Sequence, residues 1–524
     1  MKKIFLPVLL LLSAYYTSAQ DIIYADVVKA DVQRMNFEIL GRIANNYLVY
    51  KEVKGKNRIS VYDENLRLLE DVPLTNLPER QHMLDLSFFS KGSKANLVYQ
   101  YQEDNVVYLM GARVEPNGRI LEAAKVLDTT ILSYKAENKI YNSVSSEDGR
   151  RMMLFKINRR DRSLYNFSMK LYDSDLNLVQ ADQFTVPMED DTYRLGNYHL
   201  TNEGDFAFIK YNRLKSGNIA NASLIEKTPG TDFKSYNLGS AIGMGEIFLD
   251  DIKLKVDEQN QRYILTSLYS NTAKGGMDGL YVSAFSKTNG QRLFEKTWLF
   301  DEDLRKRARN KSTALKSVFN DYFINNIVLH DDGSFTVSSE ALYSTGGNAW
   351  NRWGYLGGAW GPGWGAWGPW GYGGYGHWGY WSPYRFYSPY FYRSYWWGSP
   401  GYYGGYSRYH ADNIVVVSFD SDGNKTWDNV IVKHQEDAET DGSISYQILN
   451  SDGNMHFLLN NPGKTAALEN IVINQGGSMR EGNGMQAKDK HIDFMPRYAK
   501  QVGTNELLMP YRYKNNISFA KVRF

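Results

Sequence analysis

The stretch "YHLTNEGDFAFIKYN" (198–212) decides the fold. An apolar strand runs into the polar residues Asn202, Glu203, Gly204 and Asp205, and a second apolar strand follows and ends in Tyr and Asn. Gly, Asn and Asp tolerate the backbone conformations that a tight hairpin turn requires. The stretch therefore predicts two short antiparallel strands.

This hairpin pattern recurs along the chain. Clear copies are "NIVLHDDGSFTVSSEALYS" (326–344), "YQILNSDGNMHFLLNN" (446–461) and "YNSVSSEDGRRMMLFKIN" (141–158), and looser ones are "FEILGRIANNYLVYKEV" (37–53), "LSFFSKGSKANLVYQYQ" (86–102), "IKLKVDEQNQRYILTSLYS" (252–270) and "RYAKQVGTNELLMPYRYKN" (497–515). The turns fall near residues 45, 93, 148, 204, 259, 332, 452 and 503, at steps of about 50 residues apart from two wide gaps. A repeat of this length is typical of propellers and solenoids.

Each copy continues with a second hairpin. Examples are "RISVYDENLRLLEDV" (58–72), "MKLYDSDLNLVQADQF" (169–184) and "YVSAFSKTNGQRLFEKTW" (281–298). Four short antiparallel strands per repeat predict a single all-β propeller with eight blades, and seven is the alternative because the last two units match less well. The last repeat, ending in "NNISFAKVRF" (515–524), lacks a fourth strand, and "DIIYADVVKADV" (21–32) is a strand without a blade. Pairing the two would close the ring and remove its open edges.

One hairpin also resembles a known family. "FDSDGNKTW" (419–427) is similar to the blade motif of quinoprotein-type (PQQ-like) propellers, in which an Asp-containing turn with Gly leads to a Trp. The resemblance implies the propeller fold. The dehydrogenases of that family commonly use a vicinal Cys pair beside the cofactor, and this chain contains no Cys, so we expect no such cofactor. The same blade type builds non-enzymatic periplasmic scaffolds.

The N-terminus indicates export. Lys2 and Lys3 precede an apolar run (4–12) and the small residues 17–19, so we expect a signal peptide over 1–19 and the propeller over 20–524. The apolar run is too short to span a bilayer, and no later segment is longer. We expect a location in the periplasm or on the outer surface of a Gram-negative bacterium. The net charge of +2 disfavours nucleic acid as the partner of the whole chain.

Two insertions explain the wide gaps. Residues 301–320, "DEDLRKRARNKSTALKSVFN", begin with acids and continue with bases, which suits a helix dipole and predicts an exposed basic helix. Residues 346–411 form a Gly/Trp/Tyr-rich loop inserted in blade six; ten of the 12 Trp lie between Trp350 and Trp397. The first insertion joins blades five and six, and the second joins the second and third strands of blade six. Both connections leave the same face of a meander, so we expect them to be neighbours on one rim.

The inserted residues are the candidate binding site, because binding residues often lie on loops that a rigid scaffold carries. The aromatic rings could stack on sugars, and the arginines could pair with acidic groups. The candidate residues are Trp360, Trp364, Trp367, Trp370, Trp378, Trp381, Tyr384, Arg385, Arg393, Trp396, Trp397, Arg305, Arg307 and Arg309. A purely structural packing role for the loop, self-association through it and peripheral contact with a membrane stay open as alternatives.

No catalytic residue and no metal site is predicted. The eight His are scattered without HxH, HExxH or paired spacing. "FDSDGN" (419–424) and "YDSDLN" (172–177) lack the further ligands of a calcium loop and fit hairpin turns better. The leading hypothesis is therefore a non-enzymatic exported scaffold that contacts a glycan, an envelope polymer or an envelope protein. A glycan-active hydrolase or lyase on the same fold is the alternative, and an outer-membrane β-barrel is the third.

Overall fold

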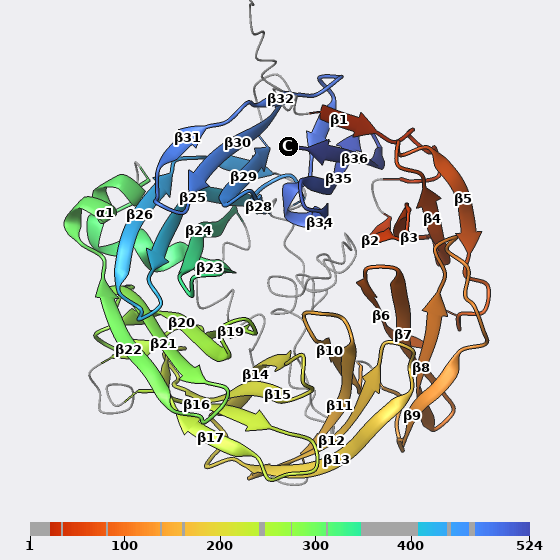
Figure 1. Cartoon of the computed structure of the whole chain (residues 1–524), viewed down its shortest axis with the longest axis horizontal. Helices are drawn as coiled ribbons and strands as arrows, with labels where there is room; N and C mark the ends of the chain where they lie inside the picture. Colours follow the sequence, from red (N-terminus) through yellow and green to blue (C-terminus); the bar gives the residue numbers. More distant parts are fainter. Residues whose placement is uncertain are drawn as a thin grey trace, which may run out of the picture.

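The computed structural model is a ring of antiparallel sheets (Figure 1). It describes residues 21–32, 35–79, 82–136, 139–159, 163–239, 247–273, 275–310, 313–346, 407–437, 442–460 and 467–524. The predicted signal peptide lies outside these residues.

Eight four-stranded units make up the described part of the chain. Blade one contains β2 (Asn36–Ile43), β3 (Asn46–Val53), β4 (Lys56–Tyr62) and β5 (Leu68–Pro73), and blade two contains β6 (Met83–Lys91), β7 (Lys94–Glu103), β8 (Val106–Val114) and β9 (Lys125–Ile131). Blade three contains β10 (Asn142–Ser145), β11 (Arg151–Arg159), β12 (Leu164–Asp173) and β13 (Leu178–Pro187), and blade four contains β14 (Tyr193–Leu200), β15 (Phe206–Arg213), β16 (Ile219–Lys227) and β17 (Lys234–Asn237).

The second half of the ring repeats this plan. Blade five contains β19 (Lys253–Asp257), β20 (Arg262–Ser270), β21 (Gly279–Ser286) and β22 (Arg292–Leu299), and the short β18 (Phe248–Leu249) joins it to blade four. Blade six contains β23 (Tyr322–Leu329), β24 (Phe335–Gly346), β25 (Ser407–Phe419) and β26 (Lys425–Ile431), with β27 (Gln435–Asp437) added to β25. Blade seven contains β28 (Tyr446–Ser451), β29 (Asn454–Asn460), β30 (Ala467–Asn474) and β31 (Met479–Glu481), with β32 (Met485–Gln486) added to β30.

Blade eight closes the ring. Its four strands are β34 (Lys500–Gly503), β35 (Glu506–Tyr513), β36 (Asn516–Arg523) and β1 (Asp21–Tyr24), which pairs antiparallel with β36. The short β33 (Ile492–Phe494) is added to β35. The first described residues thus supply the outermost strand of the last blade, as the sequence predicts. The propeller fold with the eight-blade count is confirmed, and the eight predicted first-hairpin turns all lie between the first two strands of a blade.

The alternation of side chains explains why these strands pack as blades. First strands such as β2 line the centre of the ring and fourth strands such as β5 lie at its periphery (Figure 1). The middle strands bury both faces against the neighbouring blades: every residue of β20 is buried, whereas β13 is mostly exposed. Two-sided burial requires nearly continuous apolar runs, and single-sided burial requires alternation. Gly333 and Gly423 have φ of +81° and +75°, the left-handed conformation that their turns need.

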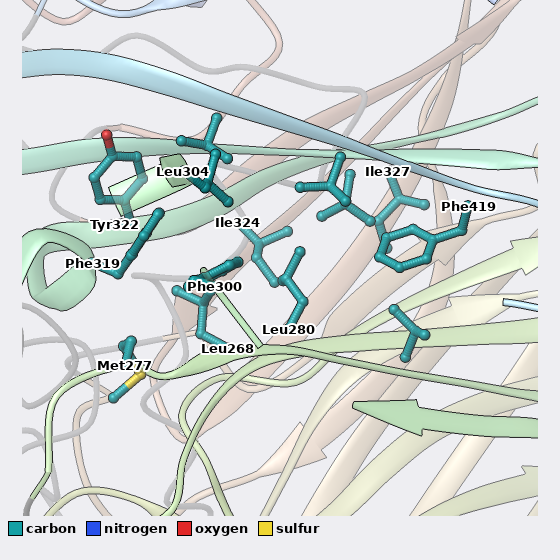
Figure 2. Close-up of a cluster of buried hydrophobic side chains, with 14 of the residues drawn as sticks. Leu268, Met277, Leu280, Phe300, Leu304, Phe319, Tyr322, Ile324, Ile327 and Phe419 are labelled. Carbon is teal, nitrogen blue, oxygen red and sulfur yellow. The ribbon is translucent and has the colours of Figure 1, made fainter. Parts of the chain in front are cut away.

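The largest described core cluster lies between blades five and six. Figure 2 shows Leu268 and Leu280 of blade five facing Ile324, Ile327 and Phe419 of blade six. Phe300, Leu304 and Phe319 come from the connection between the two blades and extend this cluster. That connection is the predicted basic insertion, so its apolar residues are part of the inter-blade core.

The insertion differs from the single helix that the sequence predicts. α1 spans Glu302–Ala308, with Asp301 as its N-cap accepting from the Leu304 amide, and a separate 3₁₀ helix, η1, spans Leu315–Asp321. A further 3₁₀ turn, η3 (Pro496–Tyr498), precedes β34. The backbone leaves helical geometry at Arg309 because Leu304 and Ala308 on one side, and Val318 and Phe319 on the other, anchor separately in the core. Of the helices in the described residues, none has both the length and the apolarity to span a membrane.

Candidate functional site

The rim of blade six where β24 and β25 leave the ring is the candidate site. β24 and β25 stay paired up to Gly346 and Ser407, so β25 begins within the range 346–411 that the sequence assigns to the loop. Residues 407–411 therefore belong to a strand rather than to the insertion. The reason is β27, which gives Tyr409, His410 and Ala411 a second partner strand. The paired residues 342–346 of β24 and 407–411 of β25 are called the stem, because they carry the residues between the two strands.

The segment 347–406 lies outside the described residues. The predicted site residues that fall in it are Trp360, Trp364, Trp367, Trp370, Trp378, Trp381, Tyr384, Arg385, Arg393, Trp396 and Trp397. That these residues bind a polymer stays a prediction. Their place in the chain fixes only that they connect the ends of β24 and β25.

The helix α1 lies against the base of this stem. The side-chain amide of Asn413 donates to the Ala308 carbonyl over 3.1 Å, and the Tyr322 hydroxyl donates to the same oxygen over 3.1 Å. The side-chain amide of Asn310 donates to the carboxylate of Asp412, the residue after Ala411 in β25. The helix C-terminus and the stem of the aromatic insertion therefore occupy the same rim.

The three arginines of the insertion differ in their surroundings. Arg305 is largely buried and donates to the carbonyls of Phe300 and Met277, each over 3.1 Å; burial lowers the pKa of its guanidinium. Arg307 pairs with Asp303 at 2.8 Å and with Asp428 of β26. Arg309 donates to the Thr313 carbonyl over 2.7 Å. Arg305 thus fixes the insertion to blade five, and Arg307 fixes it to blade six.

A buried ion pair lies beneath the stem. Lys433, between β26 and β27, contacts Glu340 of β24 at 2.7 Å, and the two side chains are 5% and 0% exposed. Burial lowers the pKa of the Lys433 ammonium, and the Glu340 carboxylate opposes that shift. Glu340 also accepts from Asn325 of β23 and from Ser445 before β28, over 2.8 and 2.6 Å. These contacts join four segments of blades six and seven below the rim.

The structure also brings together residues that the sequence analysis did not single out. His410 of β25 lies directly opposite Glu436 of β27, and His434 and Asp412 follow at the next position on the same face. The signal in the sequence is the pair of alternating motifs His410-Ala411-Asp412 and His434-Gln435-Glu436. The three-residue strand that aligns them has no sequence signature of its own.

The centre of the ring bears on the enzyme alternative. Glu38 of β2 is 1% exposed, and the pKa of its carboxyl is raised to about 8. Burial is the main cause; Lys500 of β34 opposes the shift, and Asp85 of β6 adds to it. Lys500 donates to the Leu40 carbonyl over 2.8 Å. Glu226 is the other carboxyl group in the described residues with a raised pKa, again through burial, and it lies in blade four. Both side chains are buried, and they lie in different blades.

Comparisons with known proteins give no family. No family model matches the sequence, and no curated protein matches it significantly. Solved structures align with it as follows: a prolyl endopeptidase (TM-score 0.41, 8% identity, 93% of this chain and 56% of that one), a eukaryotic initiation factor (TM-score 0.39, 9% identity, 95% and 92%) and prolyl oligopeptidase B from Galerina marginata (TM-score 0.38, 8% identity, 93% and 55%). The chain spans little more than half of the two prolyl peptidases. Similarity at this level says nothing about activity, and the propeller assignment rests on the sheets themselves.

Proposed function

We propose that this protein is a non-enzymatic, exported binding or scaffold propeller of the bacterial envelope. Its partner would be a glycan or envelope polymer, or an envelope protein, contacted by the rim of blade six. Export is proposed from the basic, apolar and small-residue pattern of residues 1–19, and no cofactor is needed for this role.

The observation that carries the proposal is the stem. β24 and β25 remain in register to Gly346 and Ser407 and are braced by β27 and by α1, so the ring holds the two ends of the segment 347–406 side by side. That segment contains ten of the 12 Trp and no Asp or Glu. Aromatic faces stack on sugar rings, and arginines pair with acidic groups. A rigid scaffold carrying such residues at one rim is a common plan for binding proteins.

We expect replacement of residues 347–406 by Asn-Gly to leave the propeller folded and to weaken polymer binding by about tenfold or more. The fold should survive because Gly346 and Ser407 are paired, so that a short turn can join them. Circular dichroism and thermal unfolding would measure the fold. Co-sedimentation with peptidoglycan and titration with isolated envelope polysaccharide would measure binding.

The control for this experiment is Lys94→Gln on the opposite rim, where Lys94 forms an exposed ion pair with Asp175. It should leave binding unchanged. Full binding by the shortened chain would contradict the proposal, as would cleavage of the polymer by the full chain, which would instead indicate the hydrolase or lyase alternative. If the deletion abolishes binding to an immobilised envelope protein and leaves polymer binding unchanged, the partner is a protein and the scaffold proposal holds.

A further inference from the structure

The stem carries a cluster of two histidines and a carboxylate with ligand atoms facing one another. One ligand atom each of His410, His434 and Glu436 lies within 4.8 Å of the other two. Strand register explains the arrangement, because His410 and Glu436 are opposite each other on β25 and β27 and side chains two positions apart share a face. Tyr343 of β24 extends the row, with its ring stacked on His410 at 4.7 Å between centroids.

His410 has an unsatisfied ring nitrogen at the centre of this cluster. Its Nδ1 is buried without a hydrogen-bond partner, and the residue is 8% exposed. The nearest carboxylate oxygen, Oε2 of Glu436, is 3.9 Å away, too far for a hydrogen bond. Two zinc ligands with bonds of about 2.1 Å lie about 3.4 Å apart in tetrahedral geometry, so a small side-chain rotation would admit an ion between them.

Each histidine has one ring nitrogen next to a hydroxyl or carboxylate, which is the arrangement expected of histidines that bind a metal through the other nitrogen. Nε2 of His410 lies 2.9 Å from the Thr345 hydroxyl, and Nδ1 of His434 lies 2.6 Å from Asp412 Oδ1. If these nitrogens carry the protons, the other nitrogen of each ring is left as a ligand, as in carboxylate–histidine–metal arrangements. Asp412 is itself held by the Tyr343 hydroxyl over 3.0 Å and by Asn310. Glu436 is oriented in turn by Arg408, which contacts its other oxygen, Oε1.

We propose that His410, His434 and Glu436 bind one divalent transition-metal ion of the zinc class at the base of the stem. Two imidazoles and one carboxylate favour Zn²⁺ and its first-row neighbours over Mg²⁺ and Ca²⁺, which take oxygen ligands. The His434 side chain is 62% exposed and the Glu436 side chain 36% exposed, so the ion remains accessible from solvent. The ion would cross-link β25 to the β27 segment and so stiffen the stem. The site depends on described residues alone and stands whether or not the rim binds a polymer.

The test uses the untagged full-length mature chain, freed of metal by a chelator. Titration with Co²⁺ should give the visible absorption of a bound, low-coordinate ion at about one equivalent, and Zn²⁺ should displace it. His434→Ala and Glu436→Gln should each weaken binding by about tenfold or more. Both side chains are partly exposed, so these variants should keep the fold, which circular dichroism would verify. Asp412→Asn should weaken binding less than loss of either ligand, because Asp412 acts only through His434.

His491→Ala is the matched control, since His491 also pairs with an aspartate, Asp489, at 2.8 Å and is 51% exposed, but lies in another blade. It should leave the Co²⁺ spectrum and the affinity unchanged. The proposal is overturned if the chain shows no saturable Co²⁺ or Zn²⁺ binding, or if His434→Ala and Glu436→Gln bind as tightly as the unmodified chain. Equal weakening by His491→Ala would likewise reduce the effect to non-specific surface binding and reject the site.

Discussion

Asp31→Ala is expected to destabilise the protein by about 3–5 kcal/mol, the cost of leaving a buried charge without its partner. Asp31 is 2% exposed and contacts the ammonium of Lys51 at 2.5 Å; Lys51 is 1% exposed and is held otherwise by the Tyr62 hydroxyl. Arg58 also pairs with Asp31. Removing the carboxylate leaves Lys51 enclosed in blade one with no anion. Chemical denaturation monitored by Trp fluorescence would measure the loss.

The position of Asp31 links this pair to ring closure. The amide of Ile517 in β36 donates to the Asp31 carbonyl over 2.9 Å, and Val32 bridges to Asn516. The segment thus crosses from the closing strand β1 to blade one. We expect Asp31→Ala to speed hydrogen exchange in β1 and β36 beyond its effect on blades three to five. The exposed pair Arg119–Glu70 is the control, and Glu70→Gln should cost less than about 1 kcal/mol. An Asp31→Ala cost in that same small range would contradict the account.

Lys433→Met is expected to cost a similar amount, about 3–5 kcal/mol, because it leaves the carboxylate of Glu340 buried without a cation. The Glu340 side chain is 0% exposed, and Asn325 and Ser445 supply only neutral donors to it. The ammonium of Lys433 also donates to the Ala411 carbonyl over 2.8 Å, so its loss should loosen β25 near the stem. Thermal and chemical unfolding would measure the effect.

The double variant Glu340→Gln/Lys433→Met separates charge from packing. Since it removes both charges, it should recover a large part of the stability lost in Lys433→Met. If the double variant is as unstable as the single one, the loss comes from packing and hydrogen bonding, and the ion pair is not the main contributor to the stability of this rim.

The architecture was predictable because the repeat is written in local turn chemistry. Asp, Asn and Gly at turns such as 201–205 and 330–334 mark the hairpins, and the apolar strands between them mark the blades. Ring closure was predictable from an unpaired first strand and a missing last one. The insertion 301–320 was less so: its charge pattern suits one helix, whereas anchoring of Leu304 and Phe319 in the inter-blade core divides it into α1 and η1.

The site was predictable only in part, for a physical reason. The rim could be inferred from the alternating strand directions of a meander, but the cluster of His410, His434 and Glu436 depends on long-range register between β25 and β27. β27 has three residues and no apolar alternation, so its pairing is set by the tertiary contacts of Lys433 and Gln435. Sequence spacing places His434 and Glu436 on one face of an extended segment, but it does not bring His410 to them. The predicted roles of the Trp and Arg residues between β24 and β25 stay predictions.

Hydrogen exchange of the mature chain with and without saturating envelope polysaccharide tests the proposed binding face most directly. We expect added protection at the stem and at the strand that supports it, in residues 341–346, 407–413 and 435–437. Added protection confined to the opposite rim, at the turns 201–205 and 420–424, would contradict it, and so would bound polymer with no protection at the stem.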